Sequence, residues 1–252
     1  MTTRPRVGLF VTCLVDLMRP SVGFASVKLL EEAGCDVEVP ATQTCCGQPA
    51  WNSGADRDAM AIAKQVIETF EPFDYIVAPS GSCAGMIRVH YPEALAGDSG
   101  YLARARALAA KTYELVQFLT QVRGASPAGA KCFTRVCYHD SCSALRELKI
   151  KKEPRQLLAN VEGLELREME DTEVCCGFGG LFSVKYPEIS ERLADDKIAR
   201  AQASGAELIT SSDLGCLLHL AGRIARRNLP LGARHIAEIL AGEDDVPPMG
   251  ET

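Results

Sequence analysis

The sequence predicts an α/β fold of two pseudo-symmetric, Rossmann-like units with mostly parallel sheets. Three observations carry this prediction. Short apolar runs alternate with segments whose apolar residues have helical spacing. The triplet CysCysGly occurs twice, at residues 45–47 and 175–177. The cysteines around the first triplet also recur around the second, at offsets of 129, 130, 130 and 133 residues (Cys13, Cys45, Cys46 and Cys83, then Cys142, Cys175, Cys176 and Cys216).

The first half has short apolar runs typical of buried strands, and these are expected at residues 6–12, 36–39 and 74–78. Helical spacing predicts helices over residues 22–33 and 55–70, the first of them ending at Gly34. The loop over residues 40–54 carries the first CysCysGly triplet. A further helix is expected to begin at Gly81-Ser82-Cys83.

The second half repeats this order, with strands expected at residues 132–139, 164–169 and 207–210 and helices at 153–160, 187–203 and 213–227. A helix over residues 101–122 and a loop over 124–130 are expected to join the halves. We therefore expect two domains, residues 1–125 and 126–252. The tail from Glu243 onward is acidic and rich in proline, and we expect it to be disordered.

The composition is that of an ordinary globular chain, with 252 residues, 47% hydrophobic residues and a net charge of −6. The negative charge argues against binding to nucleic acid, which requires a basic surface. No apolar run reaches the roughly 18 residues of a membrane span, and no signal peptide is evident. We therefore expect a cytoplasmic protein. In that compartment cysteines, of which the chain has eleven, are more often metal ligands or redox groups than disulfides.

The eight repeated cysteines are the predicted metal ligands, four in each half (Cys13, Cys45, Cys46 and Cys83; Cys142, Cys175, Cys176 and Cys216). The carboxyl ends of parallel strands share one sheet edge, where loops converge on ligands. Adjacent cysteines suit two irons of a cluster better than one zinc ion, whose ligands are usually spaced by two to four residues. Backbone N–H groups at five glycines are expected to approach the cluster sulfides (Gly47, Gly81, Gly177, Gly179 and Gly180).

The other cysteines and two histidines are expected to have packing roles. Cys35, Cys132 and Cys137 have no counterpart in the repeat and are expected in the core, with ligation by Cys137 as an alternative. His139 and His219 lie near cysteines of the second set, and we expect them to pack beside the ligands rather than to bind metal.

The two halves resemble the cysteine-rich CCG domains of heterodisulfide reductase and of the iron–sulfur subunits of glycolate oxidase and anaerobic glycerol-3-phosphate dehydrogenase. The tandem arrangement in one short chain is similar to the lactate-utilisation A family. The resemblance spans about residues 6–241. It is carried by seven main segments: Phe10 to Asp16, Gln43 to Ala50, Pro79 to Cys83, Tyr138 to Cys142, Cys175 to Gly180, Asp213 to His219 and His235 to Glu238.

The resemblance implies an iron–sulfur electron-transfer subunit of a complex that oxidises L-lactate to pyruvate. Its implied partners are two proteins, one of them an iron–sulfur protein, through which the chain could lie at the inner face of the membrane. The wider family ends each half in Cys-x-x-Cys, but here Ser80 and Asp213 occupy the first of those positions. Four cysteines per half fit two [4Fe–4S] clusters better than the five-cysteine clusters of disulfide reduction.

Two other interpretations of the sequence stay open. One cluster could act catalytically, in thiol and disulfide chemistry like that of heterodisulfide reductase, or the cysteines could hold structural zinc. The sequence contains no Gly-rich dinucleotide or phosphate motif. We therefore expect a subunit of an oxidoreductase, of the L-lactate dehydrogenase type, rather than an enzyme active alone.

Overall fold

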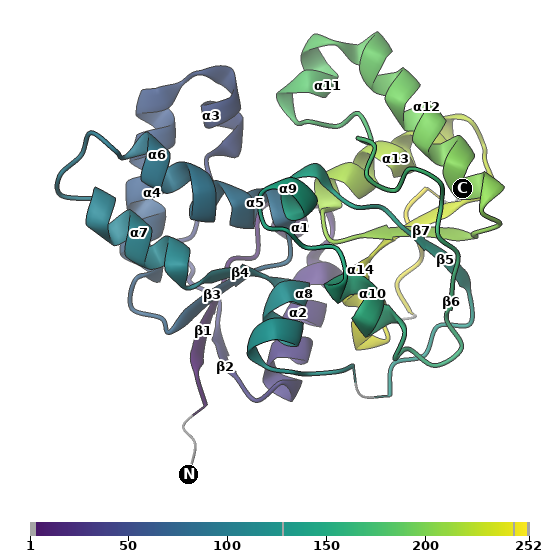
Figure 1. The fold of residues 1–252 in the computed structure, drawn as a ribbon, viewed down its shortest axis with the longest axis horizontal. Helices are drawn as coiled ribbons and strands as arrows, with labels where there is room; N and C mark the ends of the chain where they lie inside the picture. The colour runs from purple at the N-terminus through teal and green to yellow at the C-terminus, as the bar shows by residue number, and fades with distance from the viewer. Residues whose placement is uncertain (1–3, 128, 244, 251–252) are drawn as a thin grey trace. The chain divides into compact units, whose positions relative to one another are not determined.

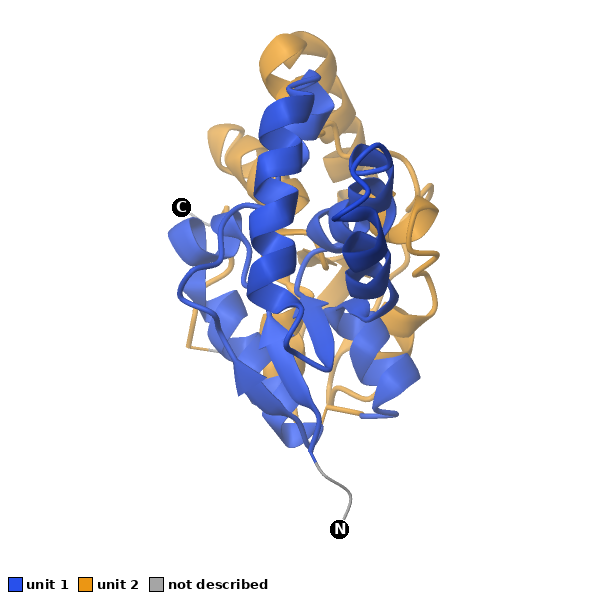
Figure 2. Ribbon diagram, turned by 90° about the vertical axis from the view of Figure 1, so that its left-hand side faces the viewer, with its two compact units in different colours: residues 1–125 blue, residues 126–252 orange. Residues whose placement is uncertain are grey.

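The computed structural model describes residues 4–127, 129–243 and 245–250. The chain divides into two compact units, residues 1–125 and 126–252, which Figure 2 colours separately. Both units have the same architecture, in which a four-stranded sheet is interleaved with helices (Figure 1). In the described part of the chain, no helix is both long and apolar enough to cross a membrane.

The sheet of the first unit is entirely parallel and has the order β2-β1-β3-β4. Its strands are β1 (Arg6–Leu9), β2 (Asp36–Glu38), β3 (Tyr75–Ala78) and β4 (Thr112–Glu114). Its helices are α1 (Cys13–Met18), α2 (Pro20–Glu32), α3 (Gln48–Ser53), α4 (Asp56–Phe70), α5 (Gly81–Gly85), the π-helix η1 (Met86–His90), α6 (Tyr91–Ala94), α7 (Leu102–Ala110), α8 (Leu115–Gln117) and the π-helix η2 (Phe118–Val122).

The sheet of the second unit is also entirely parallel, and its order β6-β5-β7-β8 is the same topology. Its strands are β5 (Arg135–Tyr138), β6 (Glu165–Leu166), β7 (Leu208–Ser211) and β8 (Gly232–His235). Its helices are α9 (Cys142–Arg146), α10 (Glu153–Leu158), α11 (Leu181–Lys185), α12 (Pro187–Ala203), α13 (Leu214–Arg226) and α14 (Ile236–Ala241).

The two central strands of each sheet are buried, as parallel strands covered on both faces should be. In the first unit Val7, Ile76 and Val77 have no exposed surface. A Cβ atom at Gly8 would come within 2.7 Å of the Phe73 ring, so this glycine lets the aromatic side chain lie against the strand.

The predicted α/β class with mostly parallel sheets is confirmed. Three local predictions are wrong, those for residues 101–122, for the loop over 40–54 and for the tail, and one strand was missed. Residues 101–122 do not form one helix, because Thr112–Glu114 leave it to pair with β3. The loop over residues 40–54 contains the helix α3, and the strand β8 was not expected. In the tail, Met249 exchanges two backbone hydrogen bonds with Ala233, so this part is ordered, whereas Asp244, Glu251 and Thr252 lie outside the described residues.

Candidate metal centre

Four cysteines of the first unit follow the carboxyl ends of its strands. Cys13 is the first residue of α1, close after β1, and Cys83 lies in α5, after β3. Cys45 and Cys46 lie in the loop between β2 and α3. Because β1 and β3 are neighbours in the sheet, the loops that carry Cys13 and Cys83 start side by side.

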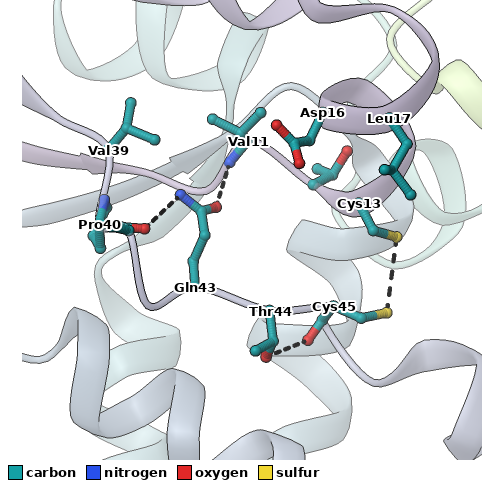
Figure 3. Close-up of a pocket in the computed structure, with 11 residues that line it drawn as sticks. Val11, Cys13, Asp16, Leu17, Val39, Pro40, Gln43, Thr44 and Cys45 are labelled. Carbon is teal, nitrogen blue, oxygen red and sulfur yellow. Dashed lines mark hydrogen bonds between the residues drawn. The ribbon is translucent and has the colours of Figure 1, made fainter.

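Two thiols of this set, those of Cys13 and Cys45, lie within hydrogen-bond distance of each other. The Cys13 Sγ donates to the Cys45 Sγ over 3.9 Å (Figure 3). The Gly47 N–H donates to the same sulfur over 3.4 Å. These hydrogen bonds, together with one from Cys46, lower the pKa of Cys45 to about 2. The same hydrogen bond raises the pKa of Cys13. These contacts favour the thiolate at Cys45, which is the form that binds metal.

Several polar contacts fix the loop that carries Cys45 and Cys46. The Gln43 side chain accepts from the Val11 N–H over 2.9 Å and donates to the Pro40 carbonyl over 3.2 Å (Figure 3). The buried Tyr91 hydroxyl donates to the Cys46 carbonyl over 2.8 Å. Beside Cys13 and Cys45, a cavity of about 310 Å³ opens, lined also by Asp16 and Leu17.

The four cysteines of the second unit repeat these positions. Cys142 begins α9 after β5, and Cys216 lies in the first turn of α13 after β7. The Gly177 N–H donates to the Cys175 Sγ over 3.3 Å. Hydrogen bonds from Cys142 and Cys176 lower the pKa of Cys175 to about 2, as happens at Cys45. In each unit the thiolate is therefore favoured at the first cysteine of the CysCys pair.

The glycines of the two CysCysGly motifs have left-handed backbones. Gly47 and Gly177 have φ values of +83° and +90°, and Gly179 and Gly180 also have positive φ. Gly81 instead occupies a helical position as the first residue of α5. Of the five glycines singled out from the sequence, Gly47 and Gly177 are the two whose N–H groups donate to a cysteine sulfur within the described ranges.

His139 lies next to the second set of cysteines and is fully buried. One ring nitrogen and the Sγ atoms of Cys176 and Cys216 all lie within 4.8 Å of one another. Neither ring nitrogen meets hydrogen-bond geometry with any described group, although the Thr172 backbone lies near the ring. Burial lowers the pKa of His139 to about 4, so the imidazole is neutral at pH 7.

The remaining residues singled out from the sequence lie away from these sets or have other partners. Cys35 and Cys137 are fully buried in the cores of the two units, and burial raises the pKa of Cys137 to about 12. Cys132 is also buried. The His219 Nε2 lies 3.2 Å from the Ser190 hydroxyl, which fixes the ring against α12. Ser80 caps α5, since its Oγ accepts from the Cys83 N–H over 3.3 Å.

Three residues that shape the second site were not singled out from the sequence. The buried Lys197 of α12 donates to the carbonyls of Asp171 and Thr172, just before the CysCys pair. Arg155 of α10 forms a bidentate pair with Asp140, whose side chain is 1% exposed. Lys197 lies on the buried face of α12 together with Ala194, Ile198 and Ala201. Its place within this apolar pattern could have indicated from the sequence that the lysine is buried.

The eleven cysteines are all free thiols. Eight of them form two sets of four at equivalent edges of two equivalent sheets, with thiolates already favoured at Cys45 and Cys175. Sets of cysteine thiolates of this kind are typical ligands of soft metal ions and of iron–sulfur clusters. The residues present therefore fit a metal-binding role in each unit.

The family model of the cysteine-rich domain named CCG matches this chain twice, over residues 7–88 and 136–221. The chain therefore belongs to the CCG cysteine-rich domain family, as the resemblance of its motifs predicted.

Its curated relatives are proteins of similar length. Lactate utilization protein A of Geobacillus kaustophilus (strain HTA426) is 48% identical over 235 residues, which cover 93% of this chain and 98% of the relative. Lactate utilization protein A of Bacillus subtilis (strain 168) is 46% identical, with the same coverage of both chains.

Among solved structures, a hypothetical protein from Helicobacter pylori superposes with a TM-score of 0.66 at 12% identity. The match covers 99% of this chain, which spans 50% of that structure. At this identity the likeness concerns the fold alone.

Proposed function

We propose that this chain binds one iron–sulfur cluster in each unit and carries electrons in a lactate-utilisation system. The ligands of the first cluster would be Cys13, Cys45, Cys46 and Cys83, and those of the second would be Cys142, Cys175, Cys176 and Cys216. A bound cluster supplies one-electron transfer, and the chain's own groups hold and shield it.

The observation that carries this proposal is the duplication of a four-thiol set at the same strand ends of two sheets. Each set has a half-buried cysteine sulfur that accepts a backbone N–H bond from the glycine of its CysCysGly motif. Such N–H bonds tune the reduction potential of a cluster. Relatives that share 45–48% of their residues with this chain are named for lactate utilisation, which supports the physiological context.

The position of Ser80 favours a four-cysteine centre over the five-cysteine type. Its hydroxyl accepts the Cys83 N–H and lies 3.1 Å from the Ser82 hydroxyl, so it serves the first turn of α5. Electron carriage is therefore a better proposal for the first site than thiol and disulfide catalysis.

Metal analysis of anaerobically purified protein tests the cluster assignment. We expect a brown protein with about eight irons and a similar amount of acid-labile sulfide, four of each per site. A colourless protein with stoichiometric zinc would contradict the proposal, since zinc also binds cysteine and histidine.

The electron-carrier role has its own test. The isolated, iron-loaded chain should not oxidise L-lactate with an artificial acceptor, whereas it should be reduced by lactate when its partner proteins are added. Turnover of lactate by the isolated chain would indicate catalysis at one of the clusters instead.

A further inference from the structure

His139 and Phe10 occupy the same position in the two units. Each residue directly follows a central strand, β5 or β1. Each backbone N–H donates over 2.8 Å to the neighbouring strand, from Phe10 to Val77 and from His139 to Thr210. Phe10 packs against Phe70, with ring centroids 5.5 Å apart. The duplicated fold therefore has an apolar ring at this position in the first unit and a polar ring at the equivalent position in the second.

The imidazole of His139 is buried without a satisfied hydrogen bond among the described residues. A buried polar group without a partner is destabilising, and such groups in native proteins usually mark a missing partner. The Thr172 carbonyl already accepts from Lys197 over 3.2 Å. The other neighbours of the ring are the sulfurs of Cys176 and Cys216, both within 4.8 Å of a ring nitrogen.

We propose that His139 donates an N–H hydrogen bond to the sulfur shell of the second metal centre, which makes this centre electronically different from the first. The inference rests on the proposed iron–sulfur function. Reduction adds negative charge to a cluster, and an N–H donor stabilises the reduced state more than the oxidised state. His139 therefore raises the reduction potential of the second centre, and it is a positioning and tuning residue rather than a ligand.

The repeat itself supplies the matched variants. His139→Phe places in the second unit the residue that the first unit already accommodates at this position, and His139→Gln keeps a neutral N–H donor of similar reach on a more flexible chain. Lys197 and the Asp140–Arg155 pair stay unchanged in both variants, so any difference belongs to the imidazole.

The experiment uses the full-length chain with the additional substitution Cys46→Ala, which leaves the second centre as the cluster observed. Anaerobic redox titration followed by electron paramagnetic resonance gives its midpoint potential. We expect His139→Phe to keep the iron of the second centre and to shift its potential to more negative values. The glutamine variant should lie between the phenylalanine variant and the parent. A weak hyperfine coupling from ¹⁵N-histidine should disappear in both variants.

Two results would overturn the inference while leaving the proposed function intact: equal potentials in parent and variants, or a nitrogen coupling as large as that of a coordinated imidazole. Loss of the second cluster in the phenylalanine variant, with the glutamine variant equal to the parent in iron and lower in potential, would support it. A parent chain that contains no iron would refute the proposed function itself.

Discussion

At the scale of single residues, Gly177 has the strictest steric requirement in the CysCysGly motifs. Its φ is +90°, and a Cβ atom there would lie 2.3 Å from the Ser190 carbonyl oxygen of α12. Gly47 has a similar φ of +83°, but its Cβ would meet the Ile62 side chain at 3.2 Å. Both glycines therefore need a left-handed backbone conformation. At Gly177 a Cβ atom would in addition clash with the backbone of α12.

This difference predicts unequal effects of alanine at the two positions. Gly47→Ala should lower the free energy of unfolding by about 1–2 kcal/mol, the usual penalty of a left-handed backbone. Gly177→Ala should lower it by about 1–3 kcal/mol more, since α12 must move. Urea denaturation of both variants measures the difference. Equal losses of unfolding free energy in the two variants would show that α12 can move without destabilising the protein.

Sequence reasoning reached the CysCysGly glycines but not every glycine that shapes the sites. Gly47, Gly177, Gly179 and Gly180 stood out because they follow cysteines. Gly215 did not, because its requirement comes from the Phe178 ring, which would lie 2.4 Å from a Cβ atom there. A contact between a loop and a helix far apart in sequence leaves no local pattern.

At the scale of elements, α10 is tied to the loop that follows β5. Arg155 of α10 contacts both carboxylate oxygens of Asp140, at 2.9 and 3.0 Å, and Asp140 lies two residues before Cys142. The Asp140 carboxylate is buried, so it depends on this partner. The pair therefore positions the start of α9 and with it the Cys142 thiol.

Arg155→Met should lower the free energy of unfolding by about 3–5 kcal/mol, because it leaves a buried carboxylate without its partner. The control is Arg192→Met, which removes a pair with Asp196 in which the arginine side chain is 78% exposed. That change should cost less than about 1 kcal/mol. Adding Asp140→Asn to Arg155→Met should restore part of the stability. A failure to do so would mean that Arg155 acts through Glu168.

The elements that sequence reasoning missed are those defined by their partners. Thr112–Glu114 lie between two segments with helical spacing, and only pairing with β3 makes them a strand. In Gly232–His235, Ala233 is the one residue with an apolar side chain, so no apolar run marks this strand in the sequence. Its residues are buried because they pair with β7. The long helices α4 and α12 were predicted within a residue because their apolar faces are local patterns.

At the scale of the whole molecule, each unit carries its own complete set of four cysteines on its own sheet. The repeat in the sequence was sufficient to predict this duplication, because the cysteines keep a nearly constant offset between the halves. It could not reveal that the units differ at His139 and Phe10, because that difference depends on burial and on distances to sulfur.

Separate sites predict separate losses of metal. Cys46→Ala and Cys176→Ala should each remove about half of the iron, and the double variant should remove nearly all of it, since each cluster needs its own ligands. Cys35→Ala is the control, because Cys35 is buried in the core away from both sets. Iron analysis after anaerobic purification measures all four proteins. Complete loss of iron from either single variant would show that the two sites load together.

The contact between Met249 and Ala233 has a consequence for self-association. A parallel sheet with open sides offers unpaired N–H and C=O groups that can pair with another chain. Met249 takes both backbone groups of Ala233 on the outer side of β8, over 2.8 and 2.7 Å. The segment around Met249 thus covers the edge strand of the second sheet. Its removal would leave that strand open to intermolecular β-pairing.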